Sequence, residues 1–434
     1  MKIVAAEEAA AAVRDVDTLA VPLGPGQPPL FLHTLGERER FENLTIFGAL
    51  LIDLFPLFTR PGVSLQSGFY GPAERVLRDG GYAVRFVPAD FRRFVKIARQ
   101  MKPRVMATIA TPPNAEGLCS LSLHAGATID ELRACGRDPE RVLIVEANPK
   151  LPYTLGLPPE HTHALHVDEI DFLIESDRDV ITLPDVPPSE AEQAIAEFAA
   201  KFIKEGATLQ TGIGGVPNAV AEILANREGG DYGVHSEMFT TGLMKLHRAG
   251  KVSNRSKGVH EGISIATFAM GTQEVYDWLD GEGRELVRFL PVEAVNNPEL
   301  IARNRNLISI NGALSVDLVG QVVADEIGGR QHSGIGGHED FVTAAAFSEG
   351  GRSLICLPST AGRDGEISRV VSHFPPGTCV TTPRHQVDVI ITEYGAAELS
   401  GRTNQQRREA LIEIAHPKFR DELATAAGDL SDTD

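Results

Sequence analysis

Short runs of β-branched and aliphatic residues alternate with helical stretches and Gly/Pro turns along the first half of the chain. Apolar runs of this length, bounded by turn residues, are typical of strands buried in a sheet. Asp90–Gln100 is one of the helices expected between them. The predicted strands are Thr18–Pro22, Leu44–Ala49, Ala83–Pro88, Arg104–Ile109 and Val142–Glu146. Strands that alternate with helices favour an α/β fold with a mainly parallel sheet covered on both faces.

The second half repeats this alternation after a proline-rich segment, residues 183–189. Ser189 is a suitable cap for the predicted helix Glu190–Lys204. The further predicted strands are Ala207–Gln210, Ile263–Phe268, Leu307–Asn311, Leu354–Leu357 and Val387–Thr392. We therefore predict two α/β domains, residues 1–185 and 186–434.

Length and charge narrow the possible functions. The 434 residues exceed one ordinary core and suit two domains. A formal charge of −18 argues against a nucleic-acid partner. No run approaches the roughly 18 apolar residues of a membrane helix, and the acidic N-terminal stretch lacks a signal core, so we expect a cytoplasmic protein with no membrane partner. The four cysteines are far apart, which favours small buried thiols.

A glycine-rich loop follows the predicted strand at 207–210 and contains Gly212, Gly214 and Gly215, with Pro217 at a first helical position. Glycines let the backbone approach a ligand closely, and a new helix presents unpaired N–H groups. Such a loop suits a phosphate or an oxyanion. The alternative is an ordinary strand-to-helix turn, because glycines are common there.

Glu237 lies in the segment Tyr232–Gly242, after a short strand and before the amphipathic run Phe239–His247. Ligands gather at the carboxyl ends of strands in α/β sheets, so this carboxylate is placed for chemistry. The alternative is an exposed glutamate that caps the next helix. His235 and Ser236 are adjacent, but the G-x-S-x-G turn of a serine hydrolase is absent.

A second glycine-rich turn, residues 332–338, leads into a predicted apolar helix, Phe341–Phe347. Its neighbours His332, His338, Glu339 and Asp340 could suggest a metal, but their spacing matches no common zinc site, so we expect none. Residues 392–401 predict a turn, followed by two helices divided at Pro417.

Taken in order, eight segments of the second half resemble the acetyl-CoA hydrolase/transferase family. They are GIGGVPNAV, GVHSEMF, NNPELIARN, INGALSVDLVGQV, SGIGGHEDF, LPST, TEYGAAELSGRT and IAHPKFRDEL; the first half matches more loosely, through IVEANPKLPYTLG and HVDEIDFLIE. The resemblance runs from about residue 5 to 424. It implies two open α/β domains of the CoA-transferase (NagB/RpiA) type, the C-terminal one carrying the nucleophile.

The resemblance also implies residue roles. The family's glutamate nucleophile falls on Glu237, and an asparagine that polarises the acyl carbonyl falls on Asn296, with Asn297 as the neighbouring alternative. Residues that border coenzyme A or form the oxyanion hole fall on Gly212, Ile213, Gly214, Gly215, Val216, Pro217, Asn218, Gly334, Ile335 and Gly336. Two places depart from the family pattern, residues 111–120 and His338, so the acids that are exchanged stay open.

The implied reaction is a CoA transfer between a short-chain acyl-CoA and a carboxylate such as acetate. A carboxylate, ionised at neutral pH, attacks the thioester without a base, giving an acyl-glutamyl anhydride and then a glutamyl-CoA thioester. No cofactor is expected, since the CoA thioester is a substrate. Relatives further imply a CoA cleft between the domains and a homo-oligomer, a dimer. A local basic patch can bind an anion despite the net charge, and Arg363, Arg384 and Arg402 are candidates for the CoA phosphates.

Two alternatives of different kinds remain at this point. An acyl-CoA hydrolase would use the same intermediate with water as acceptor, and a CoA sensor would bind without catalysis. A sugar-phosphate isomerase on a related architecture would not explain the two-domain length.

Overall fold

The computed structural model describes residues 1–124 and 126–429, in two compact units. Unit 1 contains Met1–Pro184, Glu237–Phe239 and Ile265–Asn297; unit 2 contains Asp185–Ser236, Thr240–Ser264 and the chain from Pro298 onward. The first junction lies in the proline-rich segment. Because the units interleave along the chain, two contiguous domains, 1–185 and 186–434, stay a prediction.

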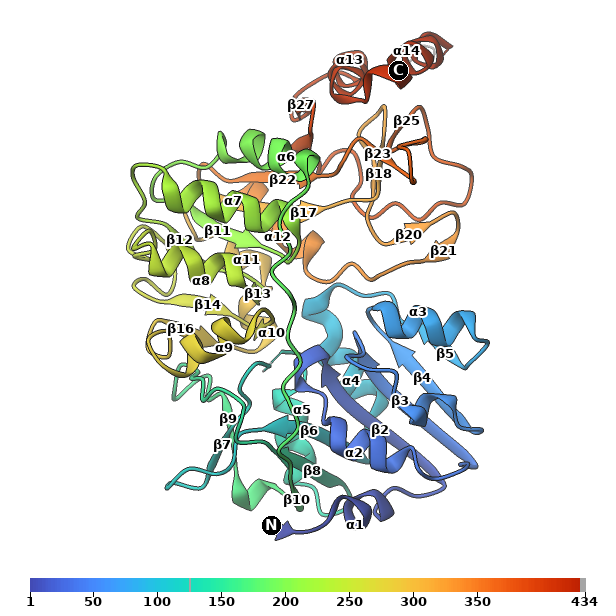
Figure 1. The fold of residues 1–434 in the computed structure, drawn as a ribbon, viewed down its shortest axis with the longest axis vertical. Helices are drawn as coiled ribbons and strands as arrows, with labels where there is room; N and C mark the ends of the chain where they lie inside the picture. Colours follow the sequence, from blue (N-terminus) through green and yellow to red (C-terminus); the bar gives the residue numbers. More distant parts are fainter. Residues whose placement is uncertain (125, 430–434) are drawn as a thin grey trace. The chain divides into compact units, whose positions relative to one another are not determined.

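Unit 1 is built on an eight-stranded sheet in which every neighbouring pair is parallel. Its order is β1 (Lys2–Ile3), β10 (Phe172–Glu175), β8 (Val142–Ala147), β6 (Val105–Ala110), β2 (Val16–Leu23), β3 (Asn43–Ala49), β4 (Val63–Ser67) and β5 (Val84–Phe86). Figure 1 shows β2, β3 and β4 side by side. The α/β fold with parallel strands is confirmed.

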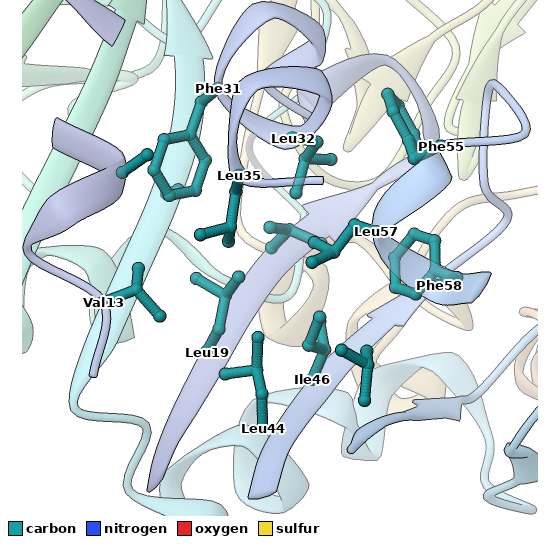
Figure 2. Close-up of a cluster of buried hydrophobic side chains, with 14 of the residues drawn as sticks. Val13, Leu19, Phe31, Leu32, Leu35, Leu44, Ile46, Phe55, Leu57 and Phe58 are labelled. Atoms are coloured by element: carbon teal, nitrogen blue, oxygen red, sulfur yellow. The ribbon is translucent and has the colours of Figure 1, made fainter. Parts of the chain in front are cut away.

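Helices cover both faces of this sheet, because successive strand residues point to opposite sides. On one face Leu19 and Val21 pack with α1 (Ala6–Ala11) and α2 (Pro29–Leu35), in the cluster of Figure 2. On the other face Ala20 and Leu23 pack with α4 (Phe94–Met101) and α5 (Ile129–Gly136). Phe268 and Val292 join the second cluster, so the later segments complete the core of unit 1. Helix α3 (Pro72–Asp79) and the antiparallel pair β7 (Leu118–Ser120) and β9 (Ala164–His166) finish the N-terminal part.

The later segments of unit 1 contain short elements. They are β13 (Met238–Phe239), β15 (Phe268–Ala269), α9 (Gln273–Asp280), β16 (Val287–Phe289) and α10 (Val292–Val295). The expected strand Ile263–Phe268 is instead β14 (Ser264–Ala266) and β15, and each pairs in a small two-stranded sheet.

Unit 2 is built on a six-stranded sheet, parallel except for its last pair. Its order is β12 (Gly233–Val234), β11 (Thr208–Thr211), β17 (Leu307–Gly312), β22 (Arg352–Cys356), β26 (Val389–Thr392) and β27 (Gly395–Glu398). Its helices are α6 (Glu190–Ala200), α7 (Gly215–Asn226), α8 (Thr241–Arg248), α11 (Pro298–Ile301), α12 (His338–Phe347), α13 (Asn404–Ile414) and α14 (Pro417–Asp429). Short strands between β17 and β26 form one three-stranded sheet and two pairs. The three-stranded sheet has the order β19 (Val322–Val323), β18 (Ser315–Asp317) and β25 (Val370–Val371), and the pairs are β20 (Glu326–Ile327) with β21 (Arg330–Gln331) and β23 (Thr360–Ala361) with β24 (Ile367–Ser368).

Several local predictions can be compared with these elements. The Ser189 hydroxyl accepts a hydrogen bond from the Glu192 amide (3.3 Å), so the predicted cap is confirmed, and Pro417 does divide two helices. One expectation is wrong: Cys379 is exposed, while the other three cysteines are buried. No helix within the described residues is long and apolar enough to cross a membrane.

Candidate active site

The backbone and the side chain of Glu237 both make hydrogen bonds within unit 1. Its carbonyl accepts hydrogen bonds from the amides of Thr267 (3.0 Å) and Phe268 (3.3 Å), at the start of the parallel pair β13–β15. The Asn296 amide nitrogen Nδ2 donates to the carboxylate Oε2 at 2.7 Å. Asn296 is fully buried and Glu237 half-buried. The structure therefore brings these two predicted residues together.

Asn296 is fixed by the short helix α10. Its backbone amide donates to the Val292 carbonyl (2.7 Å), which places it at the C-terminal end of this helix. Val292 belongs to the core of unit 1. Two residues after Glu237, the ring of Phe239 stacks on the ring of Trp278, the only tryptophan in the sequence, with the ring centroids 5.6 Å apart. Packed aromatic rings limit the motion of a segment, so the glutamate is carried by a rigid stretch.

The side chains of His235 and Ser236 make hydrogen bonds within unit 2 that give them structural roles. The Ser236 hydroxyl donates to the Thr211 carbonyl (3.0 Å) and accepts from the Thr211 amide (3.3 Å). His235 is fully buried, and its Nδ1 accepts from Asn304 Nδ2 at 3.1 Å. A serine whose proton is directed to a backbone carbonyl is not activated by a histidine.

The first glycine loop connects β11 to α7 at the carboxyl edge of the six-stranded sheet. Gly214 has φ +124°, a conformation that other residues rarely adopt. A Cβ at Gly212 would meet none of the described atoms within 4 Å, so this part of the loop borders open space. A Cβ at Gly215 would lie 2.4 Å from the Glu192 carboxylate of α6. Further along α7, Asn218 Nδ2 donates to Asp185 at 3.0 Å.

The second turn, Gly334–Gly336, is separated from α12 only by the cap residue Gly337 and has a positive φ at Gly336 (+56°). Asp325 anchors it: its backbone carbonyl accepts from the amides of His332 (2.8 Å) and Ser333 (3.1 Å), and its carboxylate accepts from Gln331 Nε2 (2.8 Å). Helix α12 packs on β17 and β22. Since a crossover helix runs antiparallel to its strands, both glycine turns lie at the carboxyl edge of this sheet.

His338 is a buried structural side chain. The Thr382 hydroxyl donates its proton to Glu339 Oε1 (2.5 Å). His338 Nε2 lies 3.0 Å from the Thr382 hydroxyl oxygen and is therefore the donor in that second hydrogen bond. Burial lowers the pKa of His338 to about 4, which keeps the ring neutral. Across the described chain, no three His, Cys, Asp or Glu side chains are grouped as a metal site would require.

The three arginines named as candidates for the CoA phosphates, Arg363, Arg384 and Arg402, are all exposed in unit 2. A feature that the sequence did not predict is a cavity of about 280 Å³ in unit 1. It lies at the carboxyl edge of the eight-stranded sheet and is lined by Gln27, Asp53, Asn148 and Arg178, among others. Asn148 belongs to the IVEANPK segment, so this family-like segment is the one sequence feature that could have pointed to the cavity.

Comparisons with known proteins agree with this architecture. Residues 271–427 match the Acetyl-CoA hydrolase/transferase C-terminal domain. The chain is 35% identical to succinyl-CoA:cyclohexane-1-carboxylate CoA transferase of Geobacter metallireducens (98% of this chain, 95% of the relative). It is 34% identical to 4-hydroxybutyrate coenzyme A transferase of Clostridium kluyveri (97% and 96%). The crystal structure of RipA from Yersinia pestis superposes with a TM-score of 0.90 at 32% identity, covering 99% of this chain and 97% of that one. This chain therefore belongs to the acetyl-CoA hydrolase/transferase family and is a CoA-transferase.

Proposed function

We propose that the protein exchanges CoA between a short-chain acyl-CoA and a small carboxylate such as acetate, with Glu237 as the nucleophile. One Glu237 oxygen attacks the thioester carbonyl, the C–S bond breaks, and an acyl-glutamyl anhydride and CoA thiolate form. The thiolate attacks the glutamyl carbonyl, releasing the first acid and leaving a glutamyl-CoA thioester. An incoming carboxylate reverses these steps and leaves as the new acyl-CoA.

The contact between Glu237 and Asn296 is the observation that carries this proposal. Asn296 Nδ2 donates to Oε2, and we assign the attack on the thioester to the other carboxylate oxygen, Oε1. When the thiolate attacks the glutamyl carbon, negative charge develops on the remaining carbonyl oxygen, Oε2. A donor fixed at 2.7 Å before the reaction stabilises that charge without reorganising.

We further propose that residues 212–218 and the turn Gly334–Gly336 border coenzyme A and supply backbone N–H donors. The positive φ values of Gly214 and Gly336 and the open space at Gly212 support this role, since a backbone free of side chains can approach a ligand. All of these residues belong to unit 2.

The test is an exchange assay with a panel of short acyl-CoAs, with and without acetate, followed by intact-mass analysis. Wild type should show acetate-dependent exchange and a CoA adduct, and Glu237→Ala should lose both. Glu299→Gln, at an exposed glutamate paired with Arg303, is the matched control and should keep full activity.

Other outcomes would redirect the proposal. Free CoA that accumulates without an acceptor would indicate a hydrolase, and CoA binding without turnover would indicate a sensor. Full activity in Glu237→Ala would overturn the nucleophile.

A further inference from the structure

The strand that precedes Glu237 in the chain is an edge strand. β12 is the first strand of the six-stranded sheet and pairs with β11 on its inner side only. Unpaired backbone groups on a buried edge cost free energy unless another group satisfies them. The question is what satisfies the outer side of β12.

At Tyr232 the outer partner is backbone. Its amide donates to the Lys251 carbonyl (2.9 Å), and its carbonyl accepts from the amides of Ser253 and Asn254 (both 3.0 Å). At Asn254 this neighbouring segment turns away, with φ +58°. Two residues further along the chain, at Val234 in β12, the backbone of that segment does not continue the pairing, and two of its side chains form the hydrogen bonds instead.

These side chains belong to Asn254 and Lys257. Asn254 Oδ1 accepts from the Val234 amide at 2.8 Å, and Lys257 Nζ donates to the Val234 carbonyl at 2.9 Å. Lys257 Nζ also donates to the Ile263 carbonyl at 2.8 Å. Both backbone groups of Val234 are thus satisfied by side chains, in the way that a neighbouring strand would satisfy them.

The side chain of Lys257 is buried and closely packed against β12. It is 1% exposed, and a Cβ at Gly233 would lie 2.4 Å from its Cγ, so its stem crosses the strand where only glycine leaves room. Burial lowers the pKa of Lys257 to about 7. In either protonation state the amine has at least two N–H groups, enough for the two carbonyls. Asn254 is fixed in turn by Ser264, whose hydroxyl lies 3.1 Å from Asn254 Nδ2 and 2.8 Å from His247 Nε2.

The two carbonyls held by Lys257 lie close in sequence to the candidate nucleophile and its support. Glu237 follows Val234 by three residues, and Thr267, whose amide binds the Glu237 carbonyl, follows Ile263 by four. We propose that Lys257 and Asn254 are positioning residues for the transfer reaction: they stand in for a missing strand beside β12 and fix the strand end from which the chain continues to Glu237. This inference rests on the proposed role of Glu237.

The test compares Lys257→Met with Lys251→Met in the full chain. Lys251 is a matched control, because its Nζ also donates to two backbone carbonyls, those of Arg227 (2.5 Å) and Gly229 (3.1 Å), but before β12 begins. Hydrogen exchange is measured on peptides covering residues 232–239, and kcat and KM are measured for acyl exchange.

Lys257→Met should raise deuterium uptake in residues 232–239 and lower kcat about 10- to 100-fold, with KM for acyl-CoA within about twofold, because small misplacements of a reacting group are costly. Lys251→Met should change neither. If Lys257→Met does not fold, Asn254→Gly takes its place, since it keeps the positive φ and removes only the side chain.

Unchanged uptake in residues 232–239 would overturn the inference, whether or not the enzyme is active. Raised uptake with wild-type kcat would overturn the positioning role and leave Lys257 a structural residue. A wild-type protein without exchange activity would instead overturn the proposed function, while the uptake comparison would still decide whether Lys257 and Asn254 fix β12.

Discussion

At the scale of single residues, the Asn296 side-chain amide is a hydrogen-bond partner of the Glu237 carboxylate. Asn296 is buried, ends a core-packed helix and donates to Oε2 at 2.7 Å. An amide in this place carries no charge, so it orients the carboxylate without forming an ion pair that would weaken its nucleophilicity. The role of Asn296 can be separated from that of Glu237 because the nucleophile survives its removal.

Asn296→Ala should therefore lower kcat by about 10²- to 10³-fold, the usual cost of losing one oxyanion donor. The CoA adduct should still form, but slowly, because Oε1 and Oε2 remain. Steady-state rates together with the time course of the adduct by mass spectrometry check this. A rate equal to wild type would show that the donor is dispensable.

Gly212 allows the approach of a ligand to be tested without disturbing the fold. Its backbone lies outside the left-handed region and a Cβ would meet no described atom within 4 Å. Gly212→Ala should thus change the thermal midpoint by no more than about 2 °C, as expected for an unstrained surface substitution. If CoA approaches the loop, kcat/KM should fall at least about tenfold, since the added methyl occupies that space. Unchanged kinetics would remove Gly212 from the binding residues.

At the scale of elements, Glu192 couples the cap of α6 to the glycine loop. Its carboxylate accepts from the Ser189 amide (2.8 Å) and hydroxyl (2.7 Å), completing a capping box. The same carboxylate lies where a Cβ at Gly215 would be. A side chain at Gly215 must therefore push Glu192 out of the cap, and the start of α7 and the start of α6 are adjusted together.

Gly215→Ala should consequently destabilise the protein by about 1–2 kcal/mol, the typical cost of a lost cap plus crowding. In the Glu192→Ala background, the same glycine substitution should cost much less, because the clash has gone. Denaturant midpoints of the four proteins give the coupling energy. Additive effects would show that the two helix starts are independent.

At the scale of the whole molecule, burial of histidine determines the response to acid. Desolvation lowers the pKa values of three buried histidines, His124 to about 3 and His163 and His338 to about 4, and that of the half-buried His247 to about 4. In the unfolded chain they take up protons below about pH 6.5. The unfolded state then binds more protons, so stability falls as the pH falls from about 6.5 towards 4. Glu146 opposes this, because burial raises its pKa to about 7 and its folded form gains a proton in the same range.

We expect the free energy of unfolding to fall by no more than about 4 kcal/mol per pH unit near pH 5.5, because the effect of four histidines is partly offset by that of one carboxyl group. Thermal midpoints measured from pH 7.5 to 5 should fall steadily, and less steeply in His338→Gln. A midpoint that rises between pH 6.5 and 5.5 would show that the histidines are protonated in the folded state.

The sequence predicted the α/β fold because buried parallel strands leave a clear signal, as in Leu44–Ala49 and Leu307–Asn311. It missed β4 and β10, which have five and four residues. It also joined β14 and β15 into one strand, because the two-residue pairing of β15 with β13 depends on a partner that the local pattern does not contain. Glu237 was singled out by its position after a strand, but its role as nucleophile and the choice of Asn296 came from family resemblance. Their 2.7 Å contact depends on the tertiary structure. Lys257 looked like any polar residue, since nothing local reveals that a lysine is buried.

The interleaving of the units has a consequence for synthesis on the ribosome. Unit 1 is complete only when residues 265–297 have emerged, because Phe268 and Val292 belong to its core. By then the chain has already delivered Asp185–Ser236 and Thr240–Ser264, which belong to unit 2. During synthesis, the N-terminal part of unit 1 therefore exposes an apolar face until residues 265–297 have been made. A fragment that ends near residue 185 would expose that face permanently.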